Sequence, residues 1–169
     1  MVRGRILDNP WNEGNQRKLS NTNKLHYNCG GYALGLFNWF IPWTEELDDQ
    51  LRSGDLVHSE DNYEEFLTTC VKYMVEHLPV REINSLNELK KREYAVAFRL
   101  AVDDFHFIKR GFNGVWYDKQ GWCPFINTHT EDDVLNNDAW YGRYNSRIVL
   151  LAMKKKGLTN RQPCDIINI

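Results

Sequence analysis

The sequence lacks the features that mark several classes of protein. It has no long hydrophobic run, since its longest apolar stretch, residues 32–43, is interrupted by Gly35 and Asn38 and is too short to span a bilayer. It has little net charge, −2 from 21 basic and 23 acidic side chains, so we expect no nucleic-acid partner. The first residues contain no apolar run, so we expect no signal peptide, no membrane partner and a cytoplasmic location.

Cysteine is also scarce, and its spacing excludes the zinc and redox sites that need closely spaced cysteine pairs. The four cysteines are Cys29, Cys70, Cys123 and Cys164, and none forms a CxxC pair of the kind used for zinc or redox chemistry. Without a secretory signal we expect free thiols. We therefore expect no metal and no cofactor, and we ask whether one thiol is a nucleophile.

Periodicity predicts one domain in which helices precede strands. Helices are predicted over residues 29–40, from Ser59 or Asp61 to about Leu78, and over the shorter stretches 85–91 and 130–135, whereas the acidic stretch 44–60 is expected to be mobile. Strand patterns follow at 94–102, 105–109, 115–118 and 147–153. This order predicts an α+β fold spanning 1–169, with an N-terminal arm at 1–28 and a C-terminal tail at 158–169.

Cys29 lies where a thiol is easily ionised. Asn28, Gly30 and Gly31 suit a helix start, which puts Cys29 in the first turn at the positive end of the helix dipole. That location favours the thiolate, and the Cys29 amide can donate to an oxyanion. The two glycines would leave room for a substrate to approach the backbone. The alternative is a buried structural cysteine.

A hairpin downstream offers a base and a carboxylate. Alternation puts His106 and Ile108 on one face of a strand. With a three-residue loop at 111–113, Ile108 faces Trp116 and His106 faces Asp118, so that Asp118 can fix the tautomer of His106. A slip of one residue would point Asp118 away. The alternative is an ordinary surface hairpin. Together, Cys29, His106 and Asp118 form a candidate Cys–His–Asp site.

These segments resemble the NlpC/P60-type cysteine peptidases of the papain-like superfamily. In that family an Asp-Cys-Ser-Gly segment begins the nucleophile helix, and a His and then a third polar residue follow on later strands. Here the matching residues are Asn28-Cys29-Gly30-Gly31, His106 and Asp118, over roughly a quarter of the chain. The resemblance implies a nucleophile helix packed on a small antiparallel sheet, with Cys29, His106 and Asp118 catalytic.

The implied reaction is hydrolysis of an amide bond through a thioester. The substrate would be a peptide or a peptidoglycan-type peptide, and a protein substrate stays open. Two alternatives remain: a cysteine-dependent deamidase or acyltransferase, and a non-catalytic binding module on the same fold.

Further residues are candidates for holding the substrate or its oxyanion. Asn23 and Tyr27 precede the nucleophile, where this superfamily often has a polar oxyanion-binding side chain, and Gly30 follows it. Trp116 and Trp122 are candidate walls of a substrate groove. The remaining histidines have weaker patterns. His26 is a lesser candidate for the base, and we expect His58, His77 and His129 to lie in loops or on the surface.

Overall fold

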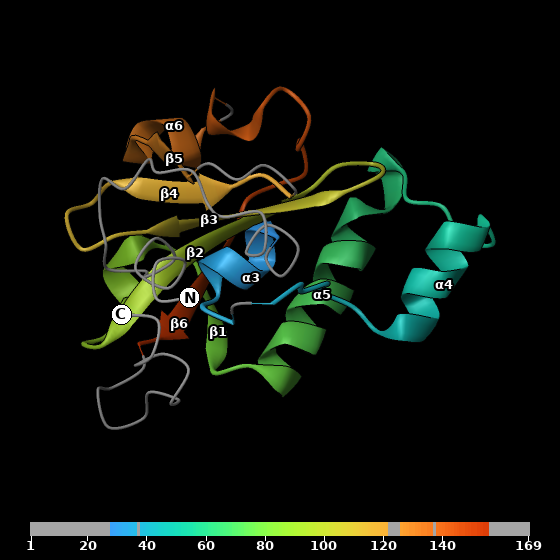
Figure 1. Ribbon diagram of the computed structural model, residues 1–169, viewed down its shortest axis with the longest axis horizontal. Coiled ribbons are helices and arrows are strands. Elements are labelled where there is room, and N and C mark those ends of the chain that lie inside the picture. Colours follow the sequence, from blue (N-terminus) through green and yellow to red (C-terminus); the bar gives the residue numbers. More distant parts are fainter. Residues whose placement is uncertain (1–27, 37, 122–125, 137, 156–169) are drawn as a thin grey trace, which may run out of the picture.

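The computed structural model describes residues 28–36, 38–121, 126–136 and 138–155 (Figure 1). In chain order its elements are α3 (Cys29–Ala33), α4 (Glu45–Ser53), η1 (Glu60–Asn62), α5 (Tyr63–His77), β1 (Val80–Ile83), η2 (Leu86–Glu88), β2 (Glu93–Leu100), β3 (Phe105–Arg110), β4 (Trp116–Lys119), β5 (Ile126–His129), α6 (Glu131–Leu135), η3 (Asp138–Trp140) and β6 (Val149–Lys154). The predicted α+β class is confirmed. Asn23, Tyr27, Trp122, Cys123 and Cys164 lie outside the described residues.

The sheet has six strands in the order β1-β6-β2-β3-β4-β5, and every neighbouring pair is antiparallel. The strands predicted from the sequence correspond to β2, β3, β4 and β6. The sequence analysis missed β1 and β5, which are only four residues long and form the two edges. Strands this short carry few alternating positions, and β4, which is equally short, is recognised only through the hairpin loop before it.

The sheet separates two hydrophobic clusters. Alternate residues of β2 point to opposite faces, so Val96 and Phe98 join one cluster while Ala95 and Ala97 join the other. The first cluster lies under α3 and α5, and the second lies under α6 and η3. Figure 1 shows α3 and α5 well apart from α6. Because both faces of β2 are covered, its central residues, Tyr94 to Phe98, form a continuous apolar run.

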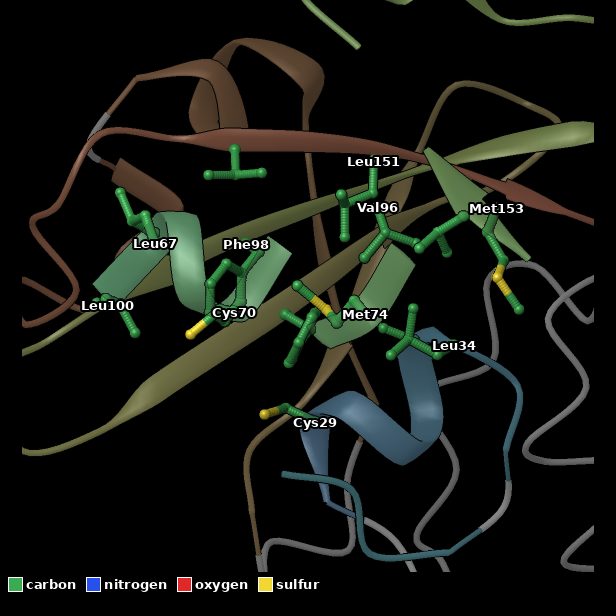
Figure 2. Packing of buried hydrophobic residues seen from close by; sticks show 14 of the residues in the cluster. Cys29, Leu34, Leu67, Cys70, Met74, Val96, Phe98, Leu100, Leu151 and Met153 are labelled. Atoms are coloured by element: carbon green, nitrogen blue, oxygen red, sulfur yellow. The ribbon is translucent and has the colours of Figure 1, made fainter. Parts of the chain in front are cut away.

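Helix α5 follows the predicted pattern closely. Its buried positions Phe66, Leu67, Cys70 and Met74 recur at helical spacing and face the sheet, as Figure 2 shows for three of them. The short η1 precedes it, and Ser59 and Asn62 form a capping box there. Val75 was expected on the same apolar face but is exposed, because it lies past the edge of the buried stripe.

Two helical segments differ from the prediction. The nucleophile helix was expected to reach about residue 40, but α3 ends at Ala33, and Gly35 then takes a left-handed φ of 67° that turns the chain. The acidic stretch 44–60 was expected to be mobile, yet it holds helix α4, which Thr44 caps by accepting a hydrogen bond from the Leu47 amide. None of the residues of α4 is fully buried, and only Leu47 and Leu51 pack against the first cluster from it, so its core-facing stripe is short.

Candidate active site

The start of α3 is fixed by one side chain, Asn28. Its Oδ1 accepts hydrogen bonds from the Gly31 amide at 2.9 Å and from the Phe40 amide at 3.0 Å, and its Nδ2 donates to Phe40 O at 2.6 Å. Asn28 therefore caps the helix and also holds the returning chain beside it. The predicted helix start at Cys29 is confirmed, and the thiol occupies the first helical position.

The glycines after Cys29 serve packing and leave no open space. A Cβ on Gly30 would come within 2.9 Å of the Phe40 ring and 3.1 Å of the Phe107 ring. A Cβ on Gly31 would overlap the backbone of Asn38. The expectation that Gly30 and Gly31 leave room for a substrate is therefore wrong, because the chain itself fills that room.

The Cys29 thiol lies beside β3, beyond the end of β4. The Ala101 amide donates to Asp104 O, so in the alternating ladder between β2 and β3 the Phe105 carbonyl points away from β2. The neighbouring strand on that side of β3 is β4. It ends at Lys119, which lies opposite Phe107, so no residue of β4 lies opposite Phe105. Cys29 Sγ lies 3.9 Å from this carbonyl. Figure 2 shows Cys29 at the margin of the first cluster, with its sulfur directed away from Leu34.

His106 and Asp118 are joined as the hairpin predicted, but through a different register. Arg110 pairs with Trp116 and Lys109 with Tyr117, so the loop spans 111–115 rather than 111–113. The Gly111 amide donates to Val115 O at 2.7 Å and closes it. Continuing this register places Asp118 opposite Ile108, two residues from His106. A shift of two residues keeps a side chain on the same face, so the contact survives the error in loop length.

The contact itself is short and buried. His106 Nε2 lies 2.5 Å from Asp118 Oδ2, and the two side chains are 2% and 0% exposed. An ionised carboxylate only accepts hydrogen bonds, so the Nε2 atom carries the proton and Nδ1 is the ring nitrogen left for another partner.

Charge in this site favours an imidazolium beside two acidic groups. Burial alone would lower the pKa of His106, but hydrogen bonds and charge interactions with Asp118 and Cys29 outweigh it and raise the pKa to about 10. Burial alone would raise the pKa of Asp118, yet hydrogen bonds from His106 and His129 hold it well below its ordinary value. The thiol, the imidazole and the carboxylate therefore interact as one group.

Three aromatic side chains enclose the imidazole. Tyr144 stacks on His106 with ring centroids 5.1 Å apart, while Trp140 and Tyr141 meet it edge-on at 6.1 and 5.6 Å. The Tyr144 hydroxyl donates to Asp104 Oδ2 at 3.1 Å. Burial, and then the charge of Asp104, raise the pKa of Tyr144, so the hydroxyl stays protonated. These rings restrict rotation of His106 and keep water from it.

Several residues around this site were missed or misplaced by the sequence analysis. His129 was expected in a loop or on the surface, but it ends β5 and its Nε2 lies 3.1 Å from Asp118 Oδ1. Tyr141 and Tyr144 were not singled out. The sequence carries one signal for Tyr141: two adjacent aromatic residues, Trp140 and Tyr141, are followed by Gly142, which is typical of a turn. His58, expected in a loop or on the surface, lies in the loop before η1 but is buried between aromatic rings.

The other candidate residues do not line an open groove within the described residues. Trp116 lies on the face of His106, as predicted, but it is fully buried in the second cluster, and its indole nitrogen donates to Glu131 Oε1 at 3.4 Å. It cannot form the wall of an exposed groove. Cys70 is a free core thiol, and burial raises its pKa to about 12, so it is not a competing nucleophile.

Metal-binding clusters and membrane-spanning helices are both absent from the parts of the chain that the structure describes. No group of three or more His, Cys, Asp or Glu side chains there is arranged to hold a metal ion. No helix there combines the length and apolar character needed to cross a membrane.

No family model, curated protein or solved structure matches this chain.

Proposed function

We propose that this protein is a cysteine hydrolase that cleaves an amide bond of a peptide. One observation carries the proposal: His106 binds the buried carboxylate of Asp118 through Nε2, while the Cys29 thiol interacts with the same ring. A nucleophile, a base and a group that orients the base are the three parts that such catalysis needs.

The first half of the reaction forms a thioester. With the Cys29 proton held on Nδ1 of His106 as an imidazolium, the thiolate attacks the carbonyl carbon of the substrate. The main-chain N–H of Cys29, at the first position of α3, has no acceptor one turn earlier in the helix, so it can donate to the oxyanion. The carbon–nitrogen bond then breaks, and the His106 imidazolium gives its proton to the leaving amine.

The second half restores the enzyme. Water enters in place of the amine, His106 takes one of its protons, and the resulting hydroxide attacks the thioester carbon. The carbon–sulfur bond breaks, the acid is released, and the sulfur leaves as a thiolate beside the imidazolium. Asp118 holds the same ring orientation in both halves.

The order of these parts supports a papain-like arrangement as a finer proposal. Cys29 begins a helix, His106 lies on a strand after it, and Asp118 lies on the next strand. The resemblance to NlpC/P60-type peptidases extends this to a peptidoglycan-type peptide as the substrate. The proposed hydrolase does not depend on that extension.

The thiol is only 4% exposed, so a large substrate reaches it only when neighbouring side chains move. The first test therefore uses iodoacetamide, a small reagent that reports thiolate reactivity. We expect Cys29 to be alkylated at pH 7 much faster than Cys70, with the modified residues identified by mass spectrometry. His106→Ala is expected to slow Cys29 by at least tenfold.

His77→Ala is the matched control, because His77 is an exposed histidine on α5 that bonds the Tyr73 carbonyl and stacks on the Tyr73 ring. It should leave Cys29 reactivity unchanged. Equal, slow alkylation of Cys29 and Cys70 in the wild type would overturn the proposal. So would a reactive Cys29 that is indifferent to His106→Ala.

Cleavage itself is tested with a panel of fluorogenic peptide amides, with the acyl-enzyme trapped by acid quenching. A thioester on Cys29 that decays in water supports hydrolysis. A thioester that persists in water and decays only when an added amine accepts the acyl group would instead identify an acyltransferase.

A further inference from the structure

Asp118 binds more than the histidine that it orients. Its Oδ2 accepts from His106 Nε2 at 2.5 Å and from the Tyr141 hydroxyl at 2.8 Å, and its Oδ1 accepts from His129 Nε2 at 3.1 Å. The carboxylate is fully buried, so these three donors take the place of water. Orientation of His106 alone needs only one of them.

The sheet places a histidine on each side of Asp118. Asp118 pairs directly with Asn127 in β5, so His129 is its diagonal neighbour on that side. In β3, His106 is the diagonal neighbour on the other side. Diagonal neighbours on one face are within reach of long side chains, so both imidazoles converge on the same carboxylate.

Tyr141 reaches the carboxylate from a strained backbone. It has a φ of 58°, which is unusual for a bulky residue, and Gly142 follows with a φ of 65°. Such strain persists only where surrounding contacts compensate for it. The compensating contacts here are the bond to Asp118 and a bond from Asn127 Nδ2 to the Tyr141 hydroxyl at 3.3 Å.

We propose that Tyr141 and His129 are positioning residues that share the negative charge of Asp118 and thereby weaken its hold on the proton of His106. The proposal rests on the hydrolase function above. A carboxylate that accepts hydrogen bonds from two further donors attracts the imidazolium proton less strongly.

This tuning matters because His106 must act as an acid as well as a base. An imidazolium bound to an unshared buried carboxylate would hold its proton too firmly to protonate the leaving amine. The Tyr141 hydroxyl can donate throughout the working range, because burial and the charge of Asp118 raise its pKa.

The other charged groups near His106 are the same in the wild type and in the variants. Cys29 faces the ring from α3, and Arg99 lies directly opposite His106 in β2. The Arg99 guanidinium donates to Ser146 O and lies 5.4 Å from the Trp140 ring. Beyond Tyr144, Asp104 and Arg143 form an ion pair at 3.2 Å.

The test is an NMR titration of the His106 ring in Tyr141→Phe, which removes only the hydroxyl. We expect the pKa of His106 to rise by about half a unit or more, roughly a threefold gain in proton affinity. Amide cleavage should slow, while cleavage of a matched ester, whose leaving group needs less protonation, should change little. A structural defect alone would slow both substrates and would not raise this pKa.

Tyr73→Phe is the matched control, because Tyr73 stacks on the exposed His77 of α5. It should leave the His106 titration unchanged. His129→Leu tests the second donor independently and is expected to raise the pKa of His106 in the same direction. An unchanged or lowered pKa of His106 in both site variants would overturn the inference. The titration needs no turnover, so it is separate from the alkylation result that decides the proposed function.

Discussion

His106 lies diagonally across the β3–β4 ladder from Asp118, two residues from the directly opposite position, and the two side chains still meet at 2.5 Å. The diagonal geometry leaves the position opposite His106 beyond the end of β4, where the Cys29 thiol reaches the Phe105 carbonyl. A register with the two residues directly opposed would extend β4 over this edge. The offset therefore lets one imidazole serve both partners.

Asp118→Asn is expected to remove the charge that keeps His106 basic. The pKa of His106 should fall from about 10 toward its ordinary value of 6.5, because burial of the ring is then less compensated. Amide cleavage should fall roughly 100-fold or more, the scale of a lost acid–base group. NMR titration and steady-state kinetics check the two effects. An unchanged His106 titration would mean that Asp118 does not set the basicity of the ring.

Alkaline pH is expected to destabilise the fold through His106. The folded-state pKa of about 10 exceeds the ordinary 6.5, so the contribution to stability is complete below pH ~6.5 and is lost as the pH rises through about 10. Urea unfolding between pH 6 and 10 should show this decline in the wild type and a flatter profile in His106→Ala. His77→Ala should decline like the wild type. Parallel profiles for all three proteins would contradict the assignment.

Acid pH is expected to destabilise the fold through His58. Burial lowers the pKa of His58 below 6.5, and its Nε2 has no hydrogen-bond partner among the described residues. The unfolded chain therefore binds a proton that the folded chain resists, and stability is lost as the pH falls below about 6.5. His58→Leu should flatten the stability profile between pH 7 and 5, whereas His77→Leu should not. Equal acid sensitivity in both variants would rule out His58 as the cause.

Adjacent positions on α5 are expected to respond very differently to truncation. Met74 is fully buried between the helix and the sheet, so Met74→Ala should cost about 2–5 kcal/mol of unfolding free energy. Val75 is 46% exposed, so Val75→Ala should change it by no more than about 0.5 kcal/mol. Urea denaturation of both variants measures the contrast, and similar losses would place the buried stripe elsewhere.

Asn28→Ala is expected to affect both stability and Cys29. The substitution removes the helix cap and the two hydrogen bonds to Phe40. It should lower the free energy of unfolding by about 1–3 kcal/mol. The first turn then loosens, so alkylation of Cys29 should slow. Thr44→Ala removes a comparable cap from the exposed α4, at about 1 kcal/mol, and should leave Cys29 unaffected. If both variants slow Cys29 equally, the effect reflects overall stability rather than the cap.

Local patterns in the sequence determined most elements and part of the site. Alternation placed His106 and Trp116 on one face, and the sequence around Asn28 marked the start of the helix at Cys29. These features depend on the residue's own backbone period and on capping within three residues, which are legible without knowing the partners. The α+β class followed from the order of these elements.

Only the tertiary structure decided which side chains and segments surround these elements and site residues. The length of the β3–β4 loop, the burial of Trp116 and the loss of space at Gly30 depend on packing against segments distant in the sequence. The bonds of His129 and Tyr141 to Asp118 likewise require β5 and the turn after η3 to be folded over the same face. A periodic pattern states which face a residue occupies. It does not state which other side chains share that face, because that depends on register and on the whole chain's packing.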